Sequence, residues 1–279
     1  MNFNKWILFS FLLVLFSCET VVDSQQYTQK ISTVCILRPY LENQRVFVYE
    51  TTKSIPDSLT NISPGKSAAP YFLESAQVKI LYHNSIIPLH LQKDSYRTQE
   101  NRYFTNQNLK IDKGNKYYLE IKYDGIKISG QTNIPEQINI SHPADSTILD
   151  SKIFNLKWNK SIGAKKYLIH TIQPAVIFID NQGNKVDTFR QSGSEYKTNM
   201  PKIQLNTLDF SKLNIYNESQ FDYLNDTLKY QIKVMAIDSN LYNHFKGAKR
   251  AGLNNGYGVF GSAVMDSIDV YLPKNELIQ

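Results

Sequence analysis

KYYLEIKY, residues Lys116–Tyr123, alternates apolar and polar side chains along its whole length. Because successive side chains of a β-strand point to opposite faces, this pattern predicts a strand with one buried face. Turn residues enclose it, with Lys113-Gly114-Asn115 before it and Asp124-Gly125 after it. A short alternating run between two turns is typical of an antiparallel sheet built from hairpins.

The same pattern continues toward the N-terminus. Residues 45–50 and 76–82 alternate, and a turn at His83-Asn84-Ser85 predicts that the second run pairs with residues 86–91 as a hairpin. Pro88 marks that return strand as an edge strand or a bulge, because proline has no N–H to donate. Many short strands with almost no helical period predict an immunoglobulin-like antiparallel β-sandwich over residues 31–136.

A second unit is expected over residues 137–279. Phe154, Leu156 and Trp158 fall on one face of a predicted strand, and residues 228–238 form a late alternating run. With Gly163-Ala164 and Tyr167 between them, these features resemble the fibronectin type III sandwich, here with long insertions. The predicted fold class is therefore all-β, with two tandem antiparallel sandwiches. Short helices are expected at residues 208–213 and 238–246, the latter with Asp238 as N-cap.

The N-terminus has the pattern of an export signal. Lys5 precedes an apolar run over residues 6–16 that is too short to span a bilayer, which predicts a signal peptide over residues 1–17. The run ends in Leu15-Phe16-Ser17-Cys18, which resembles a bacterial lipobox, so Cys18 is expected to carry acyl chains. Residues 18–30 then form a lipidated tether. Lipidation leaves Cys35 without a disulfide partner, and we expect this second cysteine to be buried and inert.

Charge and motifs argue against several function classes. The net charge of +6 is scattered apart from a local cluster of Lys246, Lys249 and Arg250, which argues against a nucleic-acid face. Residues 256–261 fit G-x-G-x-x-G, but the following residues predict a strand instead of the helix that a dinucleotide needs. We therefore expect these glycines to turn the chain tightly before the last strand.

No cofactor, metal or catalytic residue is predicted. Asp180-Asn181-Gln182-Gly183 lacks the ligand spacing of a calcium loop and is expected to be a hairpin turn. The five histidines show no metal-binding spacing and are expected at turns or on strand surfaces. No nucleophile elbow or zinc-protease helix occurs, although carboxylate pairs that form only in the folded chain stay open.

One long connection before the last strand gathers aromatic and basic residues. If exposed, it would form a binding surface; if buried, its rings would close the end of the sandwich, which is the outcome we expect for most of them. The candidate binding surface consists of Tyr242, Phe245, Tyr257, Phe260, Lys249 and Arg250.

These features together resemble a known family. The strand patterns with Ala76-x-Val78-x-Ile80 and Gly114-x-x-Tyr117, the exit at Ile134-Pro135, and the closing GYGVFGS at residues 256–262 follow the lipobox cysteine. The chain is thus similar to cell-envelope lipoproteins of Bacteroidota that are catalogued as a domain of unknown function. The resemblance implies an outer-membrane location, genes that lie near those of TonB-dependent transporters, and no established catalytic residues.

The predicted function is a membrane-anchored, non-catalytic binding or accessory subunit, serving a TonB-dependent transporter, with no cofactor and no nucleic-acid partner. Two alternatives stay open. A fimbrial or adhesive subunit would need an exchangeable edge strand. An envelope glycan hydrolase would need two carboxyl groups facing each other across a cleft. The sequence does not decide between the periplasmic and the outer face of the membrane.

Overall fold

The computed structural model describes residues 30–51, 71–96, 99–151, 153–179, 185–206 and 227–273. Cys18, the predicted signal peptide and the predicted tether up to residue 29 lie outside these ranges. The turn expected at residues 180–183 and the helix expected at residues 208–213 lie outside them as well. The described chain is almost entirely β-structure, which confirms the all-β prediction, and α2 (Ser239–Phe245) begins at the predicted N-cap Asp238.

The first unit is a two-layered β-sandwich. Its strands are β1 (Lys30–Leu37), β2 (Val46–Thr51), β3 (Tyr71–Phe72), β4 (Gln77–Tyr82), β5 (Ser85–Tyr96), β6 (Gln99–Thr105), β7 (Lys116–Tyr123) and β8 (Ile126–Asn133). β5 joins the two layers, since residues 85–89 pair with β4 and residues 90–96 pair with β6. Pro88 lies in the part of β5 for which β4 is the described strand partner, as expected for an edge position.

The second unit packs a long sheet against a small one. Its strands are β9 (Ile140–His142), β10 (Thr147–Ile148), β11 (Ile153–Trp158), β12 (Lys166–Ile179), β13 (Lys185–Thr198), β14 (Lys202–Asn206) and β15 (Thr227–Ile237). β14, β11 and β9 form the small sheet. The predicted inward face of β11 is confirmed, because Phe154, Leu156 and Trp158 are buried and the Trp158 ring meets the Tyr167 ring edge-on at 5.2 Å.

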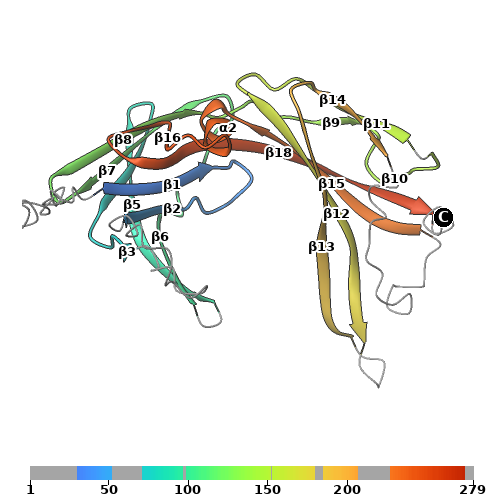
Figure 1. Ribbon diagram of the computed structural model, residues 1–279, viewed down its shortest axis with the longest axis horizontal. Helices are drawn as coiled ribbons and strands as arrows, with labels where there is room; N and C mark the ends of the chain where they lie inside the picture. The colour runs from blue at the N-terminus through green and yellow to red at the C-terminus, as the bar shows by residue number, and fades with distance from the viewer. Residues whose placement is uncertain are drawn as a thin grey trace, which may run out of the picture.

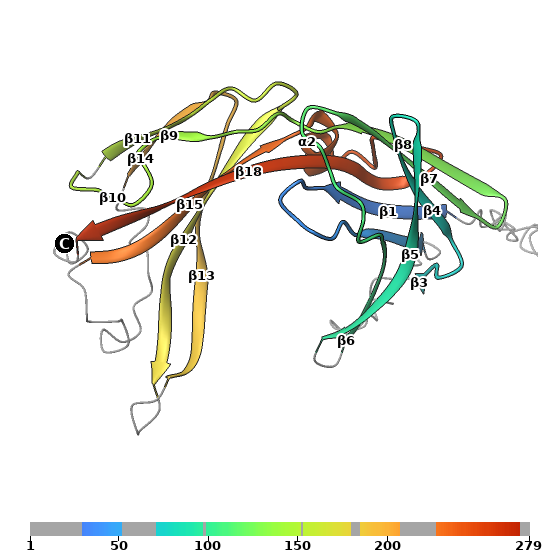
Figure 2. The ribbon, with the colours of Figure 1, turned by 180° about the vertical axis from the view of Figure 1, so that it is seen from behind.

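The last strand, β18 (Tyr257–Pro273), belongs to both units. Its second part pairs antiparallel with β15, from Ala263 to Pro273, while residues 257–262 pair in parallel with β1, from Ser32↔Tyr257 to Leu37↔Ser262. Figures 1 and 2 show β18 crossing the molecule from one unit to the other. The division at residues 136/137 stays a prediction, but the first sandwich takes in residues from the end of the chain.

The segment before β18 completes the first sandwich. β16 (Arg250–Ala251) pairs with β18, and β17 (Leu253–Asn254) pairs with β8 of the opposite layer. These few residues therefore connect the free edges of both layers. The predicted antiparallel pairing is wrong at this seam, where β1 and β16 run parallel to β18, and also at residues 270–271, where β10 runs parallel to β18.

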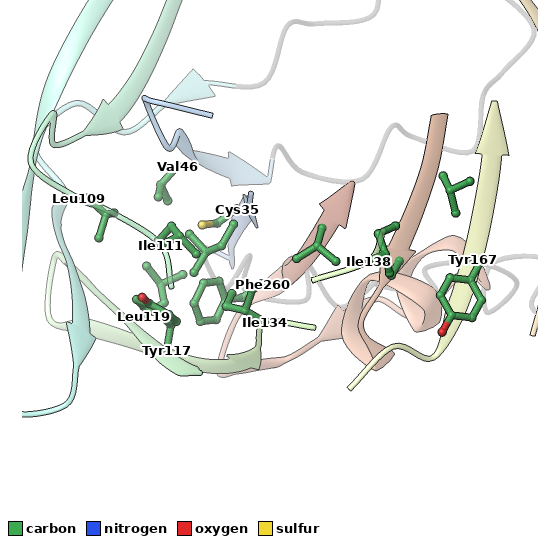
Figure 3. Packing of buried hydrophobic residues seen from close by; sticks show 14 of the residues in the cluster. Cys35, Val46, Leu109, Ile111, Tyr117, Leu119, Ile134, Ile138, Tyr167 and Phe260 are labelled. Atoms are coloured by element: carbon green, nitrogen blue, oxygen red, sulfur yellow. The ribbon is translucent and has the colours of Figure 1, made fainter. Parts of the chain in front are cut away.

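One apolar core runs through both units. Figure 3 shows Phe260 between Cys35 of the first unit and Ile134, with Ile138 leading on to Tyr167 of the second unit. The connection near Glu136 is held by the loop after β11: Ser161 Oγ donates to the Glu136 carbonyl at 2.6 Å, and the Glu136 N–H donates to the Ile162 carbonyl at 2.9 Å. The units are thus joined by a shared strand, a shared core and a hydrogen-bonded connection.

Of the glycines of GYGVFGS, Gly256 lies in a bend directly before the last strand, as the sequence had suggested, whereas Gly258 and Gly261 lie inside that strand. Gly258 has φ +97°, and a Cβ there would lie 2.1 Å from the Thr33 carbonyl oxygen of β1. At Gly261 a Cβ would meet Leu241 of α2 at 3.0 Å. The absence of side chains therefore lets β1 and α2 approach β18 closely. β18 continues as a strand beyond the motif, as predicted.

Candidate functional site

The outer face of the β1–β18 sheet carries most of the predicted site. Strand alternation directs Ile31 and Cys35 of β1 into the core, so Lys30, Val34 and Ile36 lie on the opposite face. On β18 the same alternation places Tyr257 and Val259 on that outer face, opposite Phe260. We call this outer surface, together with the helix that covers it, the α2 face.

Helix α2 is fixed on this face by its cap and by one apolar side chain. The Asp238 carboxylate accepts hydrogen bonds from the Leu241 N–H at 2.8 Å, the Ser262 N–H at 3.2 Å and the Thr132 hydroxyl at 2.7 Å. Leu241 packs on Leu168, Ile237, Ala251, Val259 and Ala263. Asp238 is buried, and this burial raises the pKa of its carboxyl, against the lowering effect of its hydrogen-bond donors.

The predicted aromatic set separates into three environments. Phe260 is fully buried and belongs to the core, so it cannot form part of a binding surface. Tyr242 and Tyr257 are half-buried, whereas Phe245 at the end of α2 is 58% exposed. The expectation that most of these rings are buried is therefore wrong for Phe245 and only partly met by the two tyrosines, because α2 lies on the outside of the sheet. Lys249 and Arg250 are exposed.

Cations surround the two half-buried tyrosines. The Arg250 guanidinium carbon lies 5.0 Å from the centroid of the Tyr257 ring, and Lys30 Nζ lies 5.5 Å from the same centroid. Hydrogen bonds from Arg250 and Lys30 lower the pKa of the Tyr257 phenol. Lys166 Nζ of β12 lies 5.7 Å from the Tyr242 ring centroid. Contacts of this kind hold positive charge close to an aromatic surface.

A second feature of the same face, the loop between β1 and β2, was not predicted from the sequence. Gln44 is 1% exposed, and its side chain closes this loop on itself. Its Oε1 accepts from the Arg38 N–H, and its Nε2 donates to the carbonyls of Arg38 and Leu41, all at 2.8 Å. A loop held by three such bonds has its binding conformation fixed in advance. The repeated arginines of R-x-x-x-x-x-x-R at residues 38–45 were the available signal.

This loop forms the rim of a pocket of about 700 Å³. Val34, Ile36 and Phe47 supply apolar walls from β1 and β2, and the loop adds Arg38, Tyr40, Leu41, Glu42, Asn43, Gln44 and Arg45. Arg45 lies over the Tyr103 ring, with its guanidinium carbon 4.4 Å from the centroid. The pocket therefore combines an apolar wall with a largely polar rim, and its volume lies within the range of sites that bind small ligands.

Two carboxylates line one other pocket, and both are paired with cations. Glu74 and Glu120 both line a depression of about 460 Å³ next to β4 and β5. Glu74 contacts Lys93 at 3.1 Å and also Arg102, while Glu120 contacts Lys127 at 2.8 Å and Lys79 at 2.7 Å. Hydrogen bonds from Lys127 and Lys79 lower the pKa of Glu120 to about 2. A carboxyl group with so low a pKa is a poor general acid.

The ion pairs of Glu120 predict an acid-sensitive contribution to stability. Since its pKa is lowered from 4.5 to about 2, the contribution is complete above about pH 4.5 and is lost as the pH falls toward 2. Glu120→Gln should therefore unfold at a lower temperature than the wild type near neutral pH, with a difference that shrinks on acidification. Thermal unfolding followed by circular dichroism at several pH values measures this. Glu42→Gln, at an exposed loop position, is the control; a Glu120→Gln difference independent of pH would contradict the assignment.

The other features considered in the sequence, metal ligands, Cys35 and membrane-spanning segments, add no further site among the described residues. Among the residues that the structure describes, no three His, Cys, Asp or Glu side chains lie together as metal ligands would. Cys35 is buried as expected, and desolvation raises the pKa of its thiol well above the usual range, which suppresses the reactive thiolate. Within the described ranges, no helix has the length and apolar character needed to cross a bilayer.

Comparisons with known proteins assign no family. No protein-family model matches the chain, and no curated protein matches it. Among solved structures, it is similar to one described as the crystal structure of Dpr11 IG1 bound to DIP-gamma IG+IG2, with 10% sequence identity over 87% of this chain and 99% of that chain, and a TM-score of 0.19. A similarity at this level carries no functional assignment.

Proposed function

We propose that the protein is a lipid-anchored extracytoplasmic binding protein of the cell outer membrane, acting without catalysis as the accessory subunit of a TonB-dependent transporter. The observation that carries the binding role is the pocket between β1 and β2, whose loop Gln44 holds in place. The anchor rests on the lipobox-like sequence at Cys18, and the transporter on the family resemblance.

The fold suits such a role because it presents the pocket from a continuous body. β18 and the core around Phe260 join the two units, so the strands that form the pocket are part of the same packed structure as the second unit. A fimbrial subunit is the alternative proposal, and it requires a strand that can be given to a neighbouring molecule. β18 does not suit that purpose, because β1 and β15 pair with it along successive parts of its length.

Capture from membranes tests the proposal. The C-terminally tagged protein is purified from outer membranes in mild detergent, and co-purifying proteins are identified by mass spectrometry. We expect a stoichiometric β-barrel transporter. Leu41→Asp, at the exposed rim of the pocket, should release it, whereas Ile162→Asp, a still more exposed apolar position in the second unit, should not.

The remaining outcomes of the capture experiment count against the proposal. Multimers of the protein itself would favour the fimbrial alternative, and a protein recovered alone would contradict the accessory role. The anchor is tested separately by metabolic labelling with a radioactive fatty acid. Label should enter the wild type and should be absent from Cys18→Ser.

A further inference from the structure

We infer that the end of the α2 face around Lys30 and Tyr257 rests on the membrane and binds anionic phospholipid headgroups. We call this area the headgroup surface; it consists of Lys30, Phe245, Lys246, Lys249, Arg250 and Tyr257. The inference rests on the proposed lipid anchor for the direction in which this surface points. Headgroup binding itself does not depend on a transporter partner.

The position of Lys30 links this surface to the anchor. Lys30 is the first residue of β1, and its Nζ lies 5.5 Å from the Tyr257 ring centroid. An acyl chain on Cys18 would be joined to it by a segment that reaches at most about 40 Å when fully extended. The anchor would therefore hold the start of β1, and with it Tyr257, within about 40 Å of the bilayer.

The chemistry of the surface fits phospholipid headgroups. Lys246, Lys249 and Arg250 are exposed in the connection that follows α2, and the Gly258 N–H donates to the Lys249 carbonyl at 2.8 Å, which ties this connection to β18 beside Tyr257. Exposed lysine and arginine side chains near an anionic bilayer each contribute about 1 kcal/mol to binding. Several of them on one surface give useful affinity only when they reach the membrane together.

Aromatic side chains complete the match. Tyr257 has Arg250 and Lys30 on its ring, so the two cations converge on one point. Phe245, which is 58% exposed, projects an apolar ring from the end of α2 on the same face of the sheet. Tyrosine and other amphipathic rings favour the interfacial region of a bilayer, where an apolar body and a polar rim are both accommodated.

Vesicle binding by the mature chain without its acyl group tests the inference. Residues 18–279 carrying Cys18→Ser are sedimented with vesicles of phosphatidylethanolamine, with or without phosphatidylglycerol. We expect binding to the phosphatidylglycerol vesicles that weakens as salt is raised. Lys249→Gln together with Arg250→Gln should reduce the partition coefficient by more than about tenfold, because each charge that is lost weakens binding about fivefold. Phe245→Ser should reduce it further.

A control with the same change in net charge makes the result specific. Lys157→Gln together with Lys160→Gln removes two exposed positive charges from the second unit. Equal losses for the two double variants would overturn the inference, as would equal binding to both kinds of vesicle. Thermal unfolding verifies that each variant is folded. Because the chain in this experiment has neither acyl group nor transporter, a negative result leaves the capture experiment unaffected.

Discussion

Gly258→Ala is expected to destabilise the whole protein by about 3 to 5 kcal/mol. Its φ of +97° is a backbone conformation that costs L-residues roughly 1–3 kcal/mol, and the added Cβ would lie 2.1 Å from the Thr33 carbonyl oxygen. Relief requires β1 and β18 to move apart, and their parallel pairing closes the first sandwich.

Trp158 fluorescence measures the effect of Gly258→Ala on the second unit separately. The chain has two tryptophans, and Trp6 lies in the predicted signal peptide, so fluorescence of the mature chain reports on the core of the second unit. If β18 couples the units, urea should unfold Trp158 and the total β-structure in one transition, shifted for Gly258→Ala. Gly125→Ala is the control, since Gly125 has φ +73° but no atom within 4 Å of an added Cβ. It should cost only about 1–2 kcal/mol. An unchanged Trp158 transition in Gly258→Ala would refute the coupling.

Asp238→Ala should cost about 2 to 4 kcal/mol. The variant loses the N-cap of α2, worth about 1 kcal/mol, removes the acceptor of the Ser262 N–H, and leaves the Thr132 hydroxyl with only its longer bond to Ser262 Oγ. Asn240 would then be the side chain of α2 that still bonds both β8 and β18, through the carbonyls of Gln131 and Phe260. Urea denaturation of the variant and the wild type gives the free energy of unfolding directly.

The matched variant is Asp238→Asn. Asparagine is a good N-cap, and its amide oxygen can accept the two N–H donors. The substitution also removes a buried carboxylate, and burial already raises the pKa of the Asp238 carboxyl. We therefore expect Asp238→Asn to remain within about 1 kcal/mol of the wild type. A loss equal to that of Asp238→Ala would mean that the charge, and not the hydrogen bonding, holds these elements together.

Local patterns predicted the features that depend on local physics. The alternation of residues 116–123 predicted β7 to the residue, the one-sided pattern of Phe154, Leu156 and Trp158 predicted a buried face, and Asp238 was identified as an N-cap. Each depends on neighbours a few residues away, through strand alternation or a hydrogen bond to the next turn.

Features that depend on distant partners were not accessible in this way. The glycines at residues 256–261 suggested only a turn. Nothing close to them in the sequence indicates that Thr33 lies against Gly258 and Leu241 against Gly261. Phe260 looked like its neighbours Tyr257 and Phe245, and only the side of β18 on which it falls makes it a core residue. Gln44 gave no signal, since its hydrogen bonds depend on the path of the β1–β2 loop.

The pairing of β1 with β18 has a consequence for the order in which the protein can fold. Residues 32–37 pair with residues 257–262, so their ladder closes a very long loop of chain, the kind of contact that slows folding. During synthesis the edge of β1 stays without this neighbour until residues 257–262 have been made. During that interval the edge is a template for aggregation. Folding of this protein should therefore depend strongly on chaperones that shield an unfinished sheet.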